Sequence, residues 1–253
     1  MRGIYPARER GTTNSFLRHG DSWGFSGIHA GIIALKKSQN RDGSWGSADK
    51  TSLTTPLVLT AILGNGESVR SQDFGECVRK AQAWVMANNP TGMAERIASA
   101  VALSVAVQSQ YSEETRSLAQ PLIDKAIVLL RDLALPTNSL WTTYLMAYGL
   151  PSEVQRSSHA TRPRDIKPLW RGLEVDFNPT MLDGYLKLYV ATCLRFHTGG
   201  KDAWANYSRE LTPQMVKWQR EDGFFPCVDE ADRYACTALA LESRQLYFIF
   251  RKW

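Results

Sequence analysis

Residues 39–45 have the sequence Gln-Asn-Arg-Asp-Gly-Ser-Trp, and residues 219–225 repeat the pattern as Gln-Arg-Glu-Asp-Gly-Phe-Phe. Each copy follows a half-polar helical segment and precedes an apolar one, so we expect a tight turn between two helices. The glycine is expected at a positive φ, and the aspartate is expected to bond the backbone two residues on. We expect the glutamine amide to tie the chain to a helix end. The aromatic ring would fill the gap between neighbouring helical hairpins.

The spacing of apolar residues predicts helices along nearly the whole chain, and no segment has the period of two typical of a strand. Half-polar helices are expected over residues 27–38, 74–87, 115–134 and 202–219. Between them, inner helices are expected over residues 53–63, 94–108, 139–148, 181–197 and 231–250. A helix that is apolar all round must be covered on every side, so the alternation indicates two layers. We therefore predict an all-α fold, an α/α toroid of about five helical hairpins.

Two helix ends are marked by the residues that break a helix. Gly64-Asn65-Gly66 is expected to stop the first inner helix with a left-handed cap, and Pro136 is expected to end the segment 115–134. Residues 149–179 contain four prolines and several basic residues, which predicts a long loop. That loop is interpreted as a solvated insertion, with a lid or anion-binding loop as the alternative.

Composition and charge bound the class of protein. The 253 residues are 43% hydrophobic and 22% charged, which excludes a disordered or collagen-like chain. No apolar run approaches the roughly 18 residues of a membrane span. The net charge of +5 comes without a Lys/Arg block, so no nucleic-acid partner is expected. Residues 1–22 lack the apolar core of a secretory signal, so we expect a flexible tail, a single domain over 23–253 and a cytoplasmic location.

The repeated turn resembles the QW repeat of squalene–hopene cyclases, other class II terpene cyclases and the wider prenyltransferase/squalene-oxidase repeat superfamily. The resemblance is densest over residues 23–64 and 181–247. It extends to Leu188-Tyr189-Val-Ala191-Thr192, to Val216-Lys-Trp-Gln219 and to Thr237-Ala238-Leu239-Ala240-Leu241-Glu242. It implies an α/α toroid with a central cavity, in agreement with the layers expected from periodicity.

The resemblance does not carry over a catalytic site. The Asp-x-Asp-Asp acid of class II cyclases is absent, and the nearest cluster is Asp229-Glu230-Ala231-Asp232. The zinc-binding Asp-x-Cys of protein prenyltransferases corresponds here to Asp232-Arg233-Tyr234. Cys227, Asp229 and Cys236, with His197, are too scattered to predict a zinc site. No metal and no cofactor is therefore expected, and the four cysteines, Cys77 and Cys193 included, are expected as reduced thiols.

Candidate functional residues lie in the first turns of the inner helices, which face the mouth of a toroid. Asp183, Asp229 and Asp232 are the candidate catalytic acids, because two carboxyl groups in one apolar mouth can serve as acid and base. The alternative for Asp183 and Asp232 is helix N-capping. Candidate ligand-binding residues are aromatic or carry a hydroxyl group: Thr51, Thr55, Trp141, Tyr144, Tyr185 and Tyr234.

The function expected from these features and from the resemblance is a terpene-cyclase/prenyltransferase-like α/α-toroid domain that lacks the usual catalytic motifs. It is expected to bind an apolar or isoprenoid-like ligand, or a partner protein, in or around its central cavity. One alternative is a terpene cyclase or prenyl-transfer enzyme that uses the aspartates at the mouth. A second alternative is a carbohydrate-active toroid. The C-terminal segment 245–253 is apolar with a basic tip, and we expect it to pack across the ring rather than rest on a membrane surface.

Overall fold

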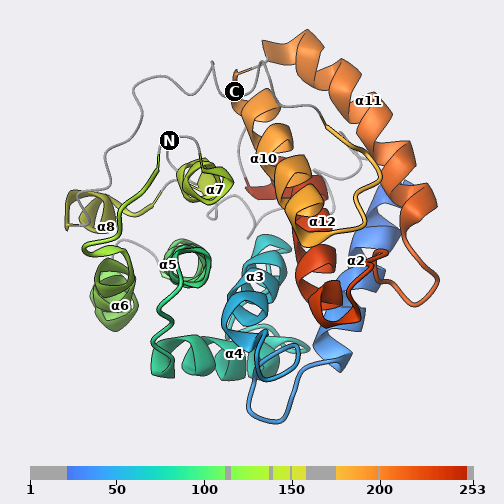
Figure 1. Ribbon diagram of the computed structural model, residues 1–253. Coiled ribbons are helices and arrows are strands. Elements are labelled where there is room, and N and C mark those ends of the chain that lie inside the picture. Colours follow the sequence, from blue (N-terminus) through green and yellow to red (C-terminus); the bar gives the residue numbers. More distant parts are fainter. Residues whose placement is uncertain are drawn as a thin grey trace.

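The computed structural model describes residues 22–111, 115–136, 139–148, 150–157, 175–198 and 200–249, and over these ranges the chain is all-α, with no strand. In Figure 1 the helices form an inner and an outer set. The inner helices are α3 (Thr51–Gly64), α5 (Met93–Gln110), α7 (Leu140–Tyr148), α10 (Leu182–Thr198) and α12 (Arg233–Ile249). The outer helices are α2 (Ser22–Lys37), α4 (Gly75–Ala87), α6 (Gln120–Leu130), α8 (Ser152–Ser157) and α11 (Gly200–Trp218). Two 3₁₀ turns, η2 (Arg116–Ala119) and η3 (Glu230–Asp232), precede α6 and α12.

The inner helices are buried on nearly every side, as their sequences predict. α3 is buried from Thr54 to Gly64, and α5 is buried from Ile97 to Val107. The inner helices contact one another in an order that returns to its start: α3 packs on α5, α5 on α7, α7 on α10, α10 on α12, and α12 on α3. The outer helices cover this set, with α2 on α12, α4 on α3, α6 on α5 and α11 on α10. Within the described ranges, none of the helices is both long and apolar enough to cross a membrane.

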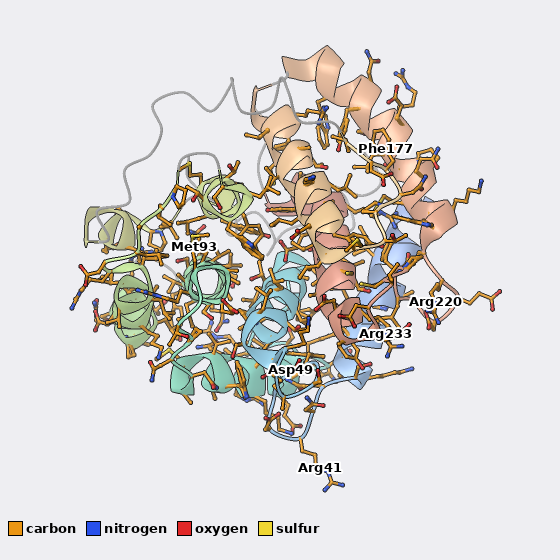
Figure 2. All side chains as sticks on the ribbon, viewed as in Figure 1. Arg41, Asp49, Met93, Phe177, Arg220 and Arg233 are labelled. Atoms are coloured by element: carbon orange, nitrogen blue, oxygen red, sulfur yellow. The ribbon has the colours of Figure 1, made fainter. Side chains whose placement is uncertain are left out.

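The first repeated turn has the expected chemistry. The Asp42 Oδ1 accepts a hydrogen bond from the Ser44 backbone N–H at 3.0 Å, which is the predicted Asx-turn. Gly43 has a φ of 95°. Trp45 is fully buried, and its Nε1 donates to the Leu35 carbonyl at 2.6 Å. Arg41 occupies a position at which the two copies carry different residues, and it projects away from the body of the molecule (Figure 2).

The second turn repeats this geometry. The Asp222 Oδ1 accepts from the Phe224 N–H at 3.1 Å, Gly223 has a φ of 87°, and Phe225 is fully buried. In each turn the residue at the Trp45 or Phe225 position donates its N–H to a threonine hydroxyl on the following inner helix. These bonds run from Trp45 to Thr55 at 3.0 Å and from Phe225 to Thr237 at 3.1 Å.

The glutamine of each turn joins its hairpin to the next outer helix. The Gln39 Nε2 donates to the Gly43 carbonyl at 2.9 Å and to the Cys77 carbonyl of α4 at 3.0 Å. The Gln219 Nε2 donates to the Gly223 carbonyl at 2.7 Å and to the Gly27 carbonyl of α2 at 2.8 Å. The hairpin of α11 and α12 therefore meets α2 in the way that the hairpin of α2 and α3 meets α4.

The predicted helix ends are confirmed in one place and wrong in another. α3 ends as expected, because Gly66 has a φ of 97° and the Gly66 N–H donates to the Leu63 carbonyl at 2.9 Å. The helix predicted over 115–134 is instead η2 followed by α6, which ends at Leu130 rather than at Pro136. The backbone turns away there, and Asp132 takes a φ of 60°.

The long loop predicted over 149–179 is wrong at its start, because α8 lies within it. Its basic part, residues 158–174, lies outside the described residues, as do residues 1–21 of the predicted tail and residues 250–253 of the C-terminal segment.

Replacing Gly43 by alanine should destabilise the fold more than the same change at Gly46. Both glycines have a positive φ, 95° and 92° respectively. A Cβ at Gly43 would lie 2.6 Å from the Lys80 carbonyl oxygen, whereas the nearest atom to a Cβ at Gly46 is 3.5 Å away. We expect Gly43→Ala to lower the free energy of unfolding by about 1–3 kcal/mol more than Gly46→Ala does, because only Gly43 adds overpacking to the backbone strain. Urea denaturation measures both, and equal losses would contradict the docking of the turn on α4.

Candidate functional site

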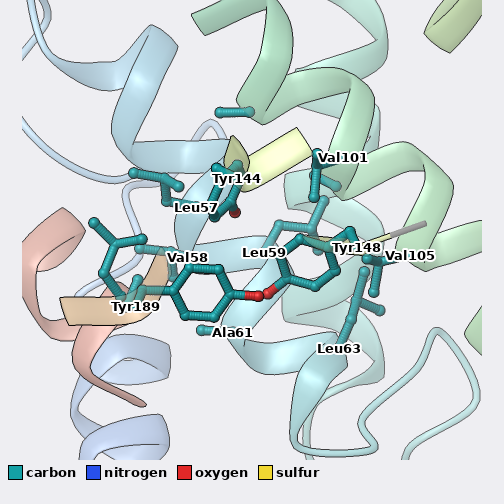
Figure 3. Close-up of a cluster of buried hydrophobic side chains, with 14 of the residues drawn as sticks. Leu57, Val58, Leu59, Ala61, Leu63, Val101, Val105, Tyr144, Tyr148 and Tyr189 are labelled. Carbon is teal, nitrogen blue, oxygen red and sulfur yellow. The ribbon is translucent and has the colours of Figure 1, made fainter. Parts of the chain in front are cut away.

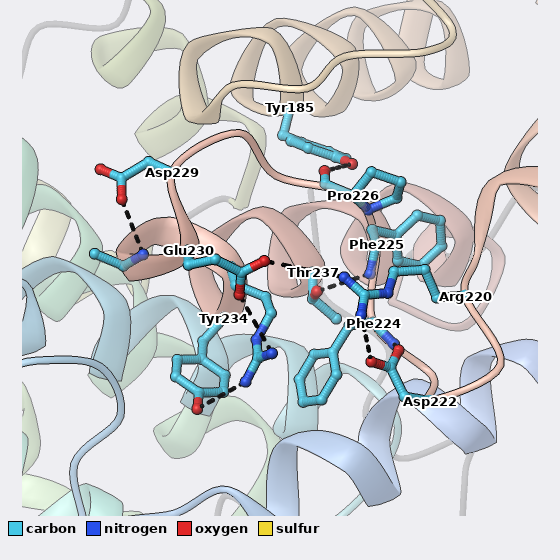
Figure 4. Close-up of polar contacts among 12 residues, drawn as sticks. Tyr185, Arg220, Asp222, Phe224, Phe225, Pro226, Asp229, Glu230, Tyr234 and Thr237 are labelled. Carbon is cyan, nitrogen blue, oxygen red and sulfur yellow. Dashed lines mark hydrogen bonds and ion pairs between the residues drawn. The ribbon is translucent and has the colours of Figure 1, made fainter.

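The predicted acids Asp229 and Asp232 lie together at the start of α12 and share a cationic partner. The Lys50 Nζ, at the start of α3, is 3.1 Å from the Asp232 Oδ1 and 3.7 Å from the Asp229 Oδ2. The Asp229 Oδ1 also accepts from the Ala231 N–H at 2.9 Å and so caps η3 (Figure 4). Hydrogen bonding and charge attraction from Asp232 raise the pKa of Lys50 above its usual value. These contacts tie the start of α12 to the start of α3.

Asp183 is exposed in the first turn of α10. Among the described residues, no hydrogen bond or ion pair connects it to Asp229 or Asp232. The Thr51 hydroxyl donates to the Ala48 carbonyl at 3.1 Å, and Thr55 is buried, where its hydroxyl accepts from Trp45.

The aromatic residues predicted at the mouth fall into two groups. Tyr185 of α10 and Tyr234 of α12 lie beside the second turn. The Tyr185 hydroxyl donates to the Pro226 carbonyl at 2.6 Å, and the Tyr234 hydroxyl accepts from the Arg233 Nη2 at 3.2 Å (Figure 4). Trp141 instead lies edge-on to Tyr144, with ring centroids 5.6 Å apart, and so points to the interior.

The interior holds a polar cluster of Tyr144 and Tyr148 from α7, Tyr189 from α10 and Glu242 from α12, all of them buried. The Tyr148 hydroxyl donates to the Glu242 Oε2 at 2.5 Å, and the Tyr144 hydroxyl lies 3.4 Å from the same atom. The ring centroid of Tyr189 is 5.3 Å from that of Tyr144 and 5.7 Å from that of Tyr148. We call these four residues and Gln245 the central cluster.

The central cluster is placed by helix periodicity and surrounded by apolar side chains. Tyr144 and Tyr148 are four residues apart on α7, and Glu242 and Gln245 are three apart on α12, so each pair shares a helix face. The neighbouring apolar side chains come from α3 and α5 (Figure 3): Leu57, Val58, Leu59, Ala61, Leu63, Val101 and Val105. A polar group buried in such surroundings loses its hydrogen bonds to water, and only protein groups can replace them.

Burial sets the protonation state of this cluster. It raises the pKa of Glu242 to about 8, against hydrogen bonds from Tyr148 and Tyr144 that lower it. Glu242 is therefore mostly a neutral carboxylic acid at pH 7, able to donate as well as accept a hydrogen bond. Burial also raises the pKa of Tyr144, Tyr148 and Tyr189 well above the usual value, which keeps their hydroxyl groups protonated.

Several polar atoms of the central cluster have no hydrogen-bond partner among the described residues. They are the Glu242 Oε1, the Tyr189 hydroxyl and both polar atoms of the Gln245 side chain. Buried polar groups are satisfied in most proteins, because an unpaired group costs about 1–3 kcal/mol. These atoms therefore keep unused hydrogen-bonding capacity in the buried interior.

Sequence reasoning identified Tyr144 but missed Tyr148, Tyr189, Glu242 and Gln245. A signal for the last two was present, because Glu242 and Gln245 lie at helical spacing between two largely apolar runs, 235–241 and 246–250. A charged residue in such a segment is rarely buried without a specific role.

The described part of the chain contains no group of three or more His, Cys, Asp or Glu side chains that could hold a metal ion. The side chain of His197 lies outside the described residues. The four cysteines are free thiols, as expected. No model of a known protein family matches the chain, and no curated protein matches it.

The Glu242 carboxyl group should make stability depend on pH. Its pKa is about 8 in the folded protein, above the usual 4.5. Below about pH 4.5 the Glu242 carboxyl group is protonated in both the folded and the unfolded protein, so the stabilising effect of its raised pKa is fully present. As the pH rises from there to about 8, the unfolded chain loses the proton first, and stability falls by up to about 1.4 kcal/mol per pH unit.

Urea denaturation across this pH window should show that loss in the wild type. Glu242→Gln, which keeps the shape but cannot ionise, should remove this part of the slope. Glu210→Gln is the control, because Glu210 is exposed on α11 and should leave the slope unchanged. A slope that Glu242→Gln leaves intact would contradict a buried carboxyl group that titrates with the fold.

Proposed function

We propose that the chain is an α/α-toroid domain that binds an apolar, isoprenoid-like ligand at its centre and contacts the ligand's neutral polar group with Glu242. The central cluster carries this proposal, because its unpaired polar atoms lie among buried apolar side chains. A ligand with a long apolar body and one small polar group matches that combination.

The toroid is supported by the order of helix contacts. α12 packs on both α10 and α3, so the order of contacts among the inner helices closes on itself. The repeated turns support the same arrangement, since the second turn joins the last hairpin to α2 as the first turn joins its hairpin to α4. These are also the contacts expected if the resemblance to the QW repeat reflects a common fold.

The protonation of the central cluster favours a neutral polar group on the ligand. Glu242, Tyr144, Tyr148 and Tyr189 are all neutral near pH 7 and offer hydroxyl donors and carboxyl oxygens. An alcohol or a carbonyl group can bond to both kinds of atom. A diphosphate would place its negative charge beside a carboxyl group that ionises near pH 8, which is unfavourable.

A second candidate function is a terpene-cyclase-like enzyme in which Glu242 donates the proton. One observation favours it: the carboxyl group stays protonated near neutral pH beside the rings of three tyrosines, and aromatic rings stabilise carbocations. This candidate replaces the acids predicted at the mouth, because Asp229 and Asp232 share Lys50 as an ion-pair partner.

Titration with farnesol, followed by tryptophan fluorescence, tests the proposed binding. We expect saturable binding of farnesol and weaker binding of farnesyl diphosphate. Glu242→Leu should weaken farnesol binding by about tenfold, the effect of losing one buried hydrogen bond of about 1.4 kcal/mol. Glu210→Gln should bind as the wild type does.

Two results would overturn the proposal: no saturable binding of farnesol, or binding that Glu242→Leu leaves unchanged. Circular dichroism of Glu242→Leu shows whether the variant is folded. Mass spectrometry of the extracted ligand separates the two candidates, since recovery of unchanged farnesol supports binding alone and a cyclised product supports the enzyme.

A further inference from the structure

Two thiols lie against each other beside the second repeated turn. Cys227 and Cys236 each shift the pKa of the other, so the two side chains are neighbours. The backbone holds them there, because the Phe225 N–H donates to the Thr237 hydroxyl at 3.1 Å and so joins the two segments that carry them. Cys227 is partly exposed, whereas Cys236 is fully buried in the first turn of α12.

The segment that carries Cys227 is fixed on both sides. The carbonyl of Pro226 accepts from the Tyr185 hydroxyl at 2.6 Å, and the Val228 N–H donates to the Thr180 carbonyl at 2.8 Å. Val228 itself is 76% exposed, so a small molecule in solvent reaches the edge of this segment. The segment that carries Cys227 is thus held in place while part of Cys227 stays accessible to solvent, whereas Cys236 is buried.

The two thiols have different chemistry. Hydrogen bonds from the Cys236 thiol and from the Asp229 backbone lower the pKa of Cys227, so its sulfur is the one that ionises. The hydrogen bond to Cys227 and burial raise the pKa of Cys236, which keeps its proton. Cys77 and Cys193 differ from Cys227, because burial raises the pKa of both, that of Cys77 to about 11. Thiolates are the reactive form, so Cys227 is the nucleophile of the pair.

We propose that Cys227 and Cys236 form an oxidisable dithiol that reacts with hydrogen peroxide and closes a disulfide between the second turn and α12. The Cys227 thiolate attacks one peroxide oxygen, the O–O bond breaks, and Cys227 becomes a sulfenic acid while hydroxide leaves and takes up a proton as water. The Cys236 proton then passes to the hydroxyl oxygen of the sulfenic acid as the Cys236 sulfur attacks the Cys227 sulfur. The S–O bond breaks, and the oxygen leaves as a second water.

The net reaction consumes one peroxide and two thiols and yields one disulfide and two waters. The new bond would link the segment after Phe225 to the helix that carries Glu242. A cross-link that closes a short loop restricts the unfolded chain, so the oxidised protein should melt at a higher temperature than the reduced protein. A dithiol reductant should restore the two thiols and the lower melting temperature.

The test treats the reduced full chain with one equivalent of hydrogen peroxide and then alkylates it under denaturing conditions. We expect intact mass to fall by two hydrogen atoms before alkylation. Peptide mapping should find Cys227 joined to Cys236, with Cys77 and Cys193 alkylated as internal controls. In Cys236→Ala the sulfenic acid on Cys227 should persist and be trapped by dimedone.

Alkylation of Cys227 and Cys236 to the same extent as Cys77 and Cys193 would overturn the proposal. So would oxidation of Cys227 beyond the sulfenic acid in the wild type, because a resolving thiol in contact should react first. The wild-type experiment decides the matter alone if Cys236→Ala does not fold.

Discussion

The double hydrogen bond of the turn glutamine is the constraint on which the rest of the structure depends. In each copy one Nε2 atom donates to the carbonyl of its own turn and to a carbonyl on the next outer helix. A planar amide has its two N–H bonds in fixed directions, so the shape of the turn and the position of the neighbouring helix are set together. The turn glycine allows the close approach, since a Cβ at Gly223 would lie 2.7 Å from the Ala30 carbonyl oxygen. The repeat therefore docks hairpins as well as turning the chain.

The all-α class, the helix positions and the chemistry of both turns are predictable from the sequence, because each depends on residues close together in the chain. Asp42 accepts a hydrogen bond from the residue two positions further along the chain. A helix that is apolar all round can be recognised without knowing which elements cover it. The end of α6 is less predictable. Apolar spacing continues to Leu133, but the backbone leaves the helix at Arg131, where ψ is 135°. Local pattern does not reveal the tertiary contacts that decide such an end.

The candidate site, in contrast, depends on residues that are far apart in the chain. Tyr148 and Glu242 are 94 residues apart, and only the packing of α7 and α12 brings them into contact. The aspartates at the helix starts stand out in the sequence, yet Asp229 serves to cap η3 and shares Lys50 with Asp232. The central cluster buries a carboxyl group and several unpaired polar atoms, which costs stability that an apolar core would not lose. Such local conflicts with good packing are expected at functional sites.

The contact of Gln219 with α2, between residues 192 positions apart, is the central claim because it joins the last hairpin to the first. Its most direct test is a double-mutant cycle on the free energy of unfolding, with Gly27→Ala, Gln219→Ala and both together. Glycine to alanine inside a helix usually stabilises by roughly 0.5–1 kcal/mol. Here a Cβ at Gly27 would lie 2.5 Å from the Gln219 Oε1 and 2.9 Å from the Arg244 Nη1. Two hydrogen bonds hold the Gln219 amide in place, so Gly27→Ala should destabilise, with a coupling energy to Gln219→Ala of about 1 kcal/mol or more. A stabilising Gly27→Ala whose effect adds to that of Gln219→Ala would contradict the account.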